Sequence, residues 1–277
     1  MTMFRNEDSV AARAAGLARH LVFGSFVAAF RARRGRGYRK SREQWDREYR
    51  EGEWKFLDGL AERSHHMVLL GYVLGQGEPK KILDVGCGTG GLLDRARKFA
   101  LGGYTGIDIS EAAVNTARER FRDVNIRFPI VFETADFESF EKPVAYDVII
   151  FNESISYARN PLAVMERFRR HLRPGGFFLV SLCYNWWQEP IMKRITRAFT
   201  VLHSADVSNE RGLTWQIRML SAENSLHAVG GNSWSRTTSR RWRFRLALAE
   251  RTVAINENLF AFISVVGAFV TGLLHRK

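Results

Sequence analysis

Three glycines at alternate positions follow a short apolar segment. Gly86, Gly88 and Gly90 come directly after residues 82–85, which predict a buried strand, and residues 92–99 beyond them predict a helix. Glycine lets the backbone turn sharply and approach a ligand closely. A glycine loop between a strand and a helix is typical of nucleotide binding, although glycines also form ordinary turns.

Acidic residues end the next two predicted strands. Asp108 ends residues 104–108 and follows the glycine loop by about twenty residues, a spacing at which a carboxylate can accept hydrogen bonds from both hydroxyls of a ribose. Asp136 and Phe137 end a third segment, 129–137. Ligands of parallel sheets bind at the carboxyl ends of the strands, so we expect these side chains and the glycine loop at one site.

The elements that must position these residues alternate along the chain. Further strands are predicted over residues 146–151 and 177–182, with helices over 111–121 and 161–172. A segment of alternating character, 213–219, predicts a strand near the edge of the sheet. This order of strands and helices predicts an α/β fold with a mostly parallel sheet.

Residues 82–182 resemble the core of the class I S-adenosylmethionine-dependent methyltransferases. Five segments carry the resemblance in chain order: Leu83–Gly90, Gly106–Ser110, Ala135–Phe137, Asp147–Glu153 and Leu172–Gly176. The resemblance implies a Rossmann-like, doubly wound sheet of seven mostly parallel strands, and S-adenosylmethionine as the cofactor. A nicotinamide dehydrogenase shares the glycine loop and the ribose carboxylate, but the third and fifth segments favour the methyl donor.

The resemblance also implies a role for each site residue. The three glycines would face the methionine part of the cofactor, Asp108 would hold the ribose, and Asp136 would contact the adenine amino group with Phe137 beside the ring. Asn152 and Glu153 would lie where donor and acceptor meet. The expected cofactor-binding residues are Asp84, Gly86, Cys87, Gly88, Gly90, Asp108, Ile109, Asp136, Phe137 and Asn152, with Arg63 from the preceding helix on the methionine carboxylate.

Methylation of a hydroxyl group also needs a base. A methyl group on a sulfonium is already activated, so the reaction mostly requires alignment and exclusion of water, whereas an acceptor hydroxyl must lose its proton. The candidate bases are Glu153, His65 and His66 and, more distantly, His203. Many small-molecule relatives carry a histidine where this chain has Tyr157, which would orient the acceptor by hydrogen bonding. An amine acceptor would need no strong base.

Aromatic residues before the first strand predict a lid. Trp45, Tyr49, Trp54 and Phe56 stand among charged residues, in a segment that could cover the cofactor or pack against the sheet. This segment, together with Phe151–Tyr157, looks like a bacterial subgroup of these methyltransferases that is found with polysaccharide and glycolipid biosynthesis.

The net charge of +13 is concentrated in two basic clusters. Residues 31–42 hold seven cations and no acid, and residues 236–245 hold five arginines, each cluster next to an apolar helical segment. This arrangement suits peripheral contact with an anionic membrane, with core packing or a homodimer contact as alternatives. No recognised RNA-binding module is present, which argues against a nucleic-acid partner. Cys87 and Cys183 are far apart, which indicates free thiols in a reducing, cytoplasmic compartment.

The sequence therefore predicts four parts: a basic amphipathic N-terminal helix and arm (1–41), a helical lid (42–80), a cofactor-binding core (81–222), and a basic segment with an apolar C-terminal helix (223–277). The predicted function is O-methylation of a saccharide or lipid-linked saccharide at the inner face of the cell membrane, with Trp186 and Trp187 stacking on the sugar. A soluble small-molecule O- or N-methyltransferase and a non-catalytic cofactor-binding partner protein are the alternatives. The chain has no Cys-x-x-Cys or His-x-x-x-His pair, so no metal is expected.

Overall fold

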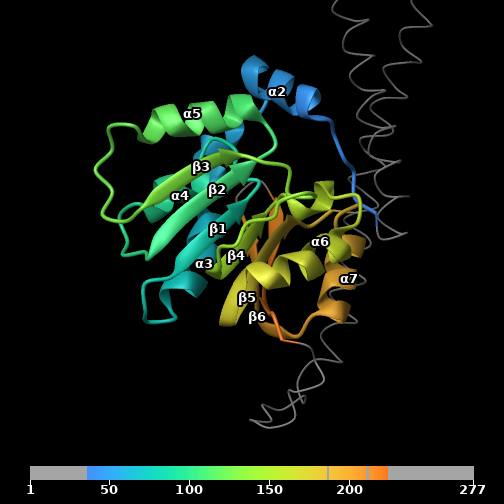
Figure 1. Cartoon of the computed structure of the whole chain (residues 1–277). Coiled ribbons are helices and arrows are strands. Elements are labelled where there is room, and N and C mark those ends of the chain that lie inside the picture. The colour runs from blue at the N-terminus through green and yellow to red at the C-terminus, as the bar shows by residue number, and fades with distance from the viewer. Residues whose placement is uncertain (1–35, 186, 210–211, 224–277) are drawn as a thin grey trace, which may run out of the picture. The chain divides into compact units, whose positions relative to one another are not determined.

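Seven strands form one mixed sheet in the order β3-β2-β1-β4-β5-β7-β6 (Figure 1). The computed structural model describes residues 36–185, 187–209 and 212–223. Strands β1 to β5 are parallel to their neighbours in this group, and β7 lies antiparallel between β5 and β6. The predicted fold class, a Rossmann-like doubly wound sheet, is confirmed. The strands are β1 (Lys81–Val85), β2 (Gly103–Asp108), β3 (Ile130–Thr134), β4 (Tyr146–Asn152), β5 (Leu172–Cys183), β6 (Val201–Ser208) and β7 (Thr214–Ser221).

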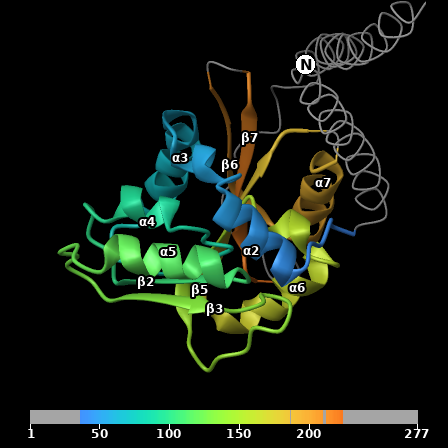
Figure 2. The ribbon, with the colours of Figure 1, turned by 90° about the horizontal axis from the view of Figure 1, so that it is seen from above.

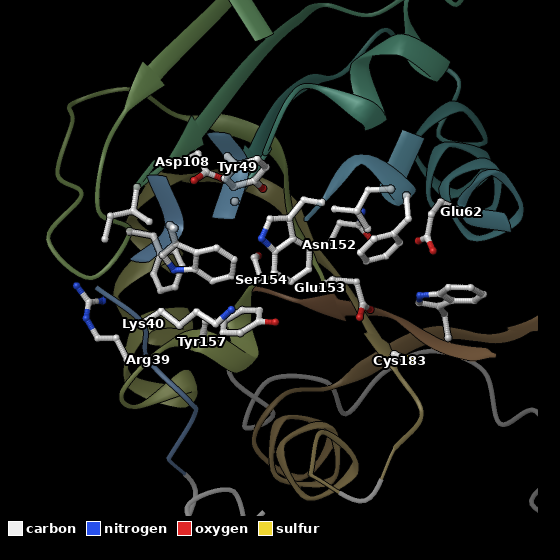
Figure 3. Close-up of a pocket in the computed structure, with 18 of the residues that line it drawn as sticks. Arg39, Lys40, Tyr49, Glu62, Asp108, Asn152, Glu153, Ser154, Tyr157 and Cys183 are labelled. Carbon is white, nitrogen blue, oxygen red and sulfur yellow. The ribbon is translucent and has the colours of Figure 1, made fainter. Parts of the chain in front are cut away.

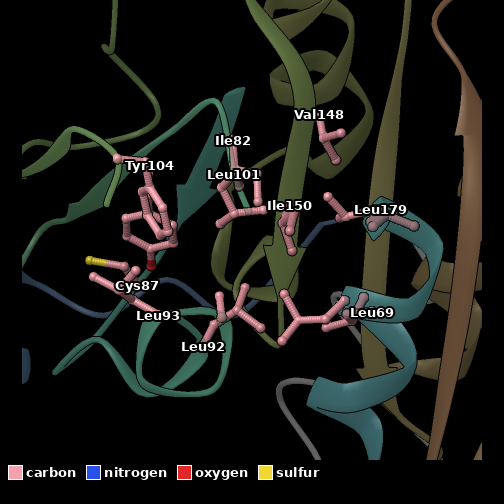
Figure 4. Packing of buried hydrophobic residues seen from close by; sticks show 14 of the residues in the cluster. Leu69, Ile82, Cys87, Leu92, Leu93, Leu101, Tyr104, Val148, Ile150 and Leu179 are labelled. Carbon is pink, nitrogen blue, oxygen red and sulfur yellow. The ribbon is translucent and has the colours of Figure 1, made fainter. Parts of the chain in front are cut away.

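Helices cover both faces of this sheet. Three pack on one face: α3 (Arg63–Leu74), α4 (Gly91–Ala96) and α5 (Glu111–Phe121). Two pack on the other: α6 (Pro161–Phe168) and α7 (Glu189–Ala198). The sheet therefore has a core on each face, the first under α3, α4 and α5 and the second under α6 and α7. Neighbouring residues of β1 face opposite cores, because Ile82 packs in the first and Leu83 in the second. Figure 4 shows the first core, where Leu69 of α3 and Leu92 of α4 lie close to Ile150 of β4.

The central strand β4 is buried on both sides. Its residues 148–151 have no exposed surface, as expected for a strand of a parallel sheet with helices on both faces. Each buried side chain of this size contributes about 1.5–3 kcal/mol to folding. The end of β4 is therefore held firmly, and with it the two residues Asn152 and Glu153 that follow the apolar run.

The segment of residues 36–62 crosses the carboxyl ends of the parallel strands. The Gly37 and Tyr38 N–H groups donate to the carbonyls of Ala158 and Ser156, both at 2.9 Å. A Cβ atom on Gly37 would lie 2.1 Å from the Ser156 oxygen, so only glycine fits there. We call residues 36–62 the N-terminal segment.

Helix α2 (Arg42–Glu51) lies within the N-terminal segment and docks on α5 (Figure 2). It begins with a capping box between Ser41 and Gln44. One carboxylate oxygen of Asp46 accepts hydrogen bonds from Ser110 Oγ at 2.7 Å and from the Ala112 N–H at 3.0 Å. An aspartate of one helix thus supports the first turn of the other, where a negative charge is stabilising.

Some elements differ in extent from the prediction. The sequence did not predict β6, and the predicted strand 213–219 is β7, which lies inside that edge strand. Strand β5 begins at residue 172 rather than 177, because Leu172 already pairs with Tyr146 before a register shift. The α-helix predicted over 161–172 ends at Phe168 and continues as a 3-10 turn to His171.

Both predicted basic and apolar flanks fall largely outside the described residues. Residues 1–35 and 224–277 lie outside the described ranges, so the predicted terminal helices and the four-part division stay predictions. Within the described ranges, none of the helices is both long and apolar enough to cross a membrane.

Candidate active site

A cavity of about 230 Å³ lies at the carboxyl ends of β1, β2 and β4 (Figure 3). It brings together eight of the fifteen predicted site residues: Gly86, Asp108, Ile109, Asp136, Phe137, Asn152, Glu153 and Tyr157. The N-terminal segment adds Arg39, Lys40, Trp45, Tyr49, Trp54, Phe56, Leu57 and Glu62, and the remaining walls are Ser154, Cys183, Leu213 and Trp215. Figure 3 shows Asp108 towards one end of the cavity, Glu62 at the other, and Glu153 between them. We call the end lined by Glu62, Glu153, Cys183, Leu213 and Trp215 the distal end.

The glycine loop packs tightly against its neighbours. Gly86 has φ +79° and Gly88 has φ +53°, a left-handed conformation that side chains rarely adopt. A Cβ on Gly86 would lie 2.4 Å from Ser154 Cβ, and one on Gly88 would lie 2.8 Å from the hydroxyl of Tyr49. Gly86 therefore lets the loop come close to the end of β4, and Gly88 makes room for the ring above it. Gly88 and Gly90 are part of this loop but do not line the cavity.

Asp108 ties the glycine loop to the end of β2. Its two carboxylate oxygens accept hydrogen bonds from the backbone N–H groups of Gly88 and Ser110, both at 2.9 Å. Burial raises the pKa of Asp108 to about 6, and these two donors oppose the rise. The carboxylate also lines the cavity, so it is placed to accept further hydrogen bonds from a ligand with hydroxyl groups.

Asp136 is paired with a residue that the sequence reasoning did not predict. The guanidinium of Arg39 donates to Asp136 Oδ2 at 2.5 Å and also contacts Glu138 at 3.1 Å. Burial acts to raise the pKa of Asp136, but the hydrogen bond from Arg39 leaves it below its usual value. Phe137 lines the cavity beside this pair. The N-terminal segment therefore closes this end of the site with a fully formed ion pair.

Aromatic side chains of the N-terminal segment form the roof of the cavity. The Trp45 ring meets the Tyr157 ring edge-on at 4.8 Å and lies 5.4 Å from the Trp54 ring. The Lys40 ammonium lies 4.5 Å from the centre of the Trp45 ring and contacts the Glu48 carboxylate at 2.7 Å. The positive charge of Lys40 is thus already matched by an acid, and the roof is apolar.

Glu153 has the most unusual environment in the site. Its φ is +58°, the only positive value for a non-glycine residue in the part of the chain that the structure describes. Within that part, its Oε1 atom is shielded from solvent and has no hydrogen-bond partner. Burial raises the pKa of Glu153 to about 8; interactions with the Cys183 backbone and the Ser181 side chain oppose the rise, and the nearby charge of Glu62 adds to it. A carboxyl of this kind can accept a proton near neutral pH.

The two predicted histidines lie behind the cavity wall. His65 and His66 are buried in α3 and do not line the cavity. Burial lowers the pKa of His65 to about 3 and that of His66 to about 4, so both rings are neutral. His65 stacks on Trp215 with 4.5 Å between ring centres, and His66 Nε2 lies 2.9 Å from the Asn152 amide nitrogen. Both histidines thus support residues that do face the cavity.

Three further predicted residues lie outside the cavity lining. Arg63 is exposed at the start of α3. Asp84 is buried within β1, where its carboxylate accepts a hydrogen bond from Tyr104 Oη at 2.5 Å. Cys87 is buried against Gly106, and burial raises the pKa of its thiol well above the usual value. No group of three or more metal-ligating side chains is found in the described ranges.

Sequence reasoning missed the distal wall of the cavity. The alternation of residues 213–219 could have indicated that Trp215 faces inward, because it occupies one of the buried positions of β7. Nothing in the sequence around Glu62 indicates that it is buried. The folded chain shows that it is only 5% exposed.

Comparisons with known proteins place this fold and site in context. A family model described as a methyltransferase domain matches residues 77–238, more than half of the chain. The ubiquinone biosynthesis O-methyltransferase of Aliivibrio fischeri is 29% identical over 133 residues, which cover 46% of this chain and 56% of that protein. Cycloartenol-C-24-methyltransferase 1 of Oryza sativa is 31% identical over 122 residues, which cover 44% and 35%. This chain thus spans about half the length, or less, of these curated relatives.

A solved structure has the same fold. The N-methyltransferase NodS of Bradyrhizobium japonicum, in complex with S-adenosyl-l-homocysteine, superposes with a TM-score of 0.52 at 20% sequence identity. The match covers 61% of this chain and 92% of that chain.

Proposed function

This chain belongs to the methyltransferase-domain family and is a class I enzyme that uses S-adenosylmethionine, and we propose that it methylates a hydroxyl group of a saccharide or lipid-linked saccharide. The observation that carries the proposal is the carboxyl of Glu153, which lines the cavity at the end of β4, has a raised pKa and has one oxygen, Oε1, shielded from solvent. The proposal also places the enzyme at the inner face of the cell membrane, and the basic clusters of the sequence support that location.

The residues present fit the cofactor. Asp108, whose carboxylate lines the cavity, would hold the ribose hydroxyls, and Asp136 with Phe137 would hold the adenine. The loop at Gly86 leaves no room for a side chain and would face the methionine part. Arg63 does not line the cavity, so we assign it no contact with the methionine carboxylate. When bound, S-adenosylmethionine supplies a methyl group that is already activated on a sulfonium.

Glu153 is the base that the geometry favours. An acceptor hydroxyl must lose its proton as the new bond to the methyl carbon forms, and a carboxylate with a pKa of about 8 is a stronger base than an ordinary one. His65 and His66 lie behind the wall and have lowered pKa values, so they are weak bases out of reach of the cavity. Tyr157 lines the cavity and would orient the acceptor, because burial raises its pKa and keeps its proton in place.

The rest of the cavity suits a ring-shaped acceptor. Trp54, Phe56 and Trp215 line it, and aromatic faces pack well against the apolar faces of sugars. That an O-methyltransferase is among the relatives also supports a hydroxyl acceptor. A soluble small-molecule O- or N-methyltransferase is the alternative, and a non-catalytic partner protein is the third possibility.

Transfer of a labelled methyl group tests the proposal. The full chain is incubated with methyl-labelled S-adenosylmethionine and with saccharide, glycolipid and small-molecule fractions of its host. We expect label in an ether-linked form in a saccharide-containing fraction. Glu153→Gln should lower the rate by about 100-fold or more while the affinity for S-adenosylhomocysteine stays the same. Label on nitrogen, or a Glu153→Gln variant with full activity, would contradict the proposal.

A further inference from the structure

The distal end of the cavity carries two carboxyl groups that no described cation balances. Glu62 and Glu153 line it, and the cations among the described lining residues are Arg39 and Lys40. Both cations are held elsewhere, because Arg39 contacts Asp136 at 2.5 Å and Lys40 contacts an acid of α2 at 2.7 Å. The distal end is therefore acidic without a matching positive charge.

Glu62 is buried, and the Oε1 atom of Glu153 is shielded from solvent. Glu62 is 5% exposed, and burial raises its pKa to about 7. Cys183, at the same end, has a pKa raised to about 12 by burial and then by the charges of Glu153 and Glu62. All three groups at this end therefore favour their protonated forms near neutral pH. Two ionised carboxyls at one buried end of a cavity are costly unless a proton or a positively charged ligand compensates them.

His65 does not provide the missing charge. Its Nδ1 lies 3.7 Å from a Glu62 oxygen, beyond hydrogen-bond distance, and the residue has no exposed surface. Neither ring nitrogen has a hydrogen-bond partner within the described residues. Because burial lowers the pKa of His65 to about 3, the ring is neutral. His65 thus gives the Glu62 carboxyl neither a hydrogen bond nor a positive charge.

Trp215 completes the distal end as an apolar wall. It stacks on His65 and lines the distal end together with Leu213. Tryptophan attracts organic cations through its ring face, most strongly where water is excluded. Two carboxyls and an indole ring at the same end of the cavity form a chemical complement to an ammonium group.

We propose that the distal end binds a protonated amino group of the acceptor, with Glu62 as its counter-charge. Glu153 lies between Glu62 and the cofactor end of the cavity, so it remains free to take the proton of the hydroxyl that is methylated (Figure 3). The inference rests on the proposed function and narrows it, because the acceptor class becomes a hydroxyl compound that also carries a basic amine, as in an amino sugar.

Two probes of the same shape test the ammonium site without any methyl transfer. The full chain, saturated with S-adenosylhomocysteine, is titrated by calorimetry with 2-phenylethylamine and with 2-phenylethanol. We expect the amine to bind roughly tenfold more tightly than the alcohol at pH 8.5. Its advantage should shrink towards pH 6, because Glu62, with a pKa of about 7, becomes protonated.

Matched variants assign the preference to one residue. Glu62→Gln should remove it, whereas Glu78→Gln, an exposed glutamate outside the cavity, should keep it. Equal binding of the two probes, no binding of the amine, or a preference that survives Glu62→Gln would overturn the inference. If Glu62→Gln does not fold, a preference in the unaltered chain that is independent of pH overturns it. An intact amine preference without any methylated hydroxyl would overturn the proposed function alone.

Discussion

Glu153 combines a left-handed backbone, a shielded oxygen and a raised pKa. A non-glycine residue with positive φ costs about 1–3 kcal/mol, a cost that persists only where the surrounding structure imposes it. Here the Glu153 N–H donates to the Ser181 carbonyl at 2.9 Å, and residues 148–151 of β4 before it are fully buried. The neighbouring strand thus holds the carboxyl where the cavity needs it.

The pH dependence of methyl transfer should report this carboxyl. A base acts in its unprotonated form, so the rate at saturating substrates is expected to rise with pH and to level off above about 8. The measurement is an initial-rate profile from pH 6 to 9.5 in constant ionic strength. Glu153→Gln should lose this rising limb, and a limb that persists in the variant would assign the titration to another group.

The sequence predicted those site residues whose positions depend only on neighbouring residues of the chain. The glycines and Asp108 were found because their spacing follows from one strand and one loop. Glu62 was not, because its burial depends on His65 and on Trp215, which is distant in the sequence. The roles of His65 and His66 as bases also needed the fold, since only the fold shows them behind the wall.

Two glycines with the same φ allow a test of how closely the glycine loop approaches Ser154. Gly86 and Gly77 both have φ +79°, but a Cβ meets Ser154 at 2.4 Å only at Gly86, and nothing within 4 Å at Gly77. Gly77→Ala should therefore cost only the backbone strain of about 1–2 kcal/mol. Gly86→Ala should cost more and weaken binding of S-adenosylhomocysteine, as measured by denaturant unfolding and calorimetry. Equal losses in the two variants would contradict the steric argument.

The docking of α2 on α5 should contribute to cofactor affinity. Asp46→Ala removes both hydrogen bonds to the first turn of α5, so we expect the N-terminal segment to loosen and the Kd for S-adenosylhomocysteine to rise by about tenfold. Glu51→Ala, which removes the same charge from an exposed position of α2, is the control. An unchanged Kd in Asp46→Ala would show that this contact does not hold the roof in place.

Element prediction succeeded where apolar runs are long and buried. Strands β1, β2 and β4 were found because they are covered on both faces. Strand β6 was missed because it is an exposed edge strand, whose residues Val201–Ser208 carry almost no buried position. Its existence follows from pairing with β7 and not from its own pattern.

The whole chain, with its net charge of +13, is expected to bind anionic vesicles. Each cation near such a surface contributes about 1 kcal/mol, and salt screens the attraction. Flotation with phosphatidylglycerol vesicles should recover the full chain at low salt, and phosphatidylcholine vesicles should not. Deletion of residues 1–35 or 224–277 should lower recovery, because the first removes part of the cluster 31–42 and the second removes all of the cluster 236–245. Equal recovery of all three chains would contradict membrane contact through these clusters.

The cavity is assembled from distant parts of the chain, and this has a consequence for its synthesis. A growing polypeptide presents its N-terminal residues first, and domains generally form in that order. The roof, at residues 36–62, and the glycine loop emerge early, whereas Leu213 and Trp215 emerge only after β6. A nascent chain therefore possesses every strand of its parallel sheet before it possesses the wall beside Glu62. The wall that the proposed ammonium site needs is thus completed only after all the parallel strands have been made.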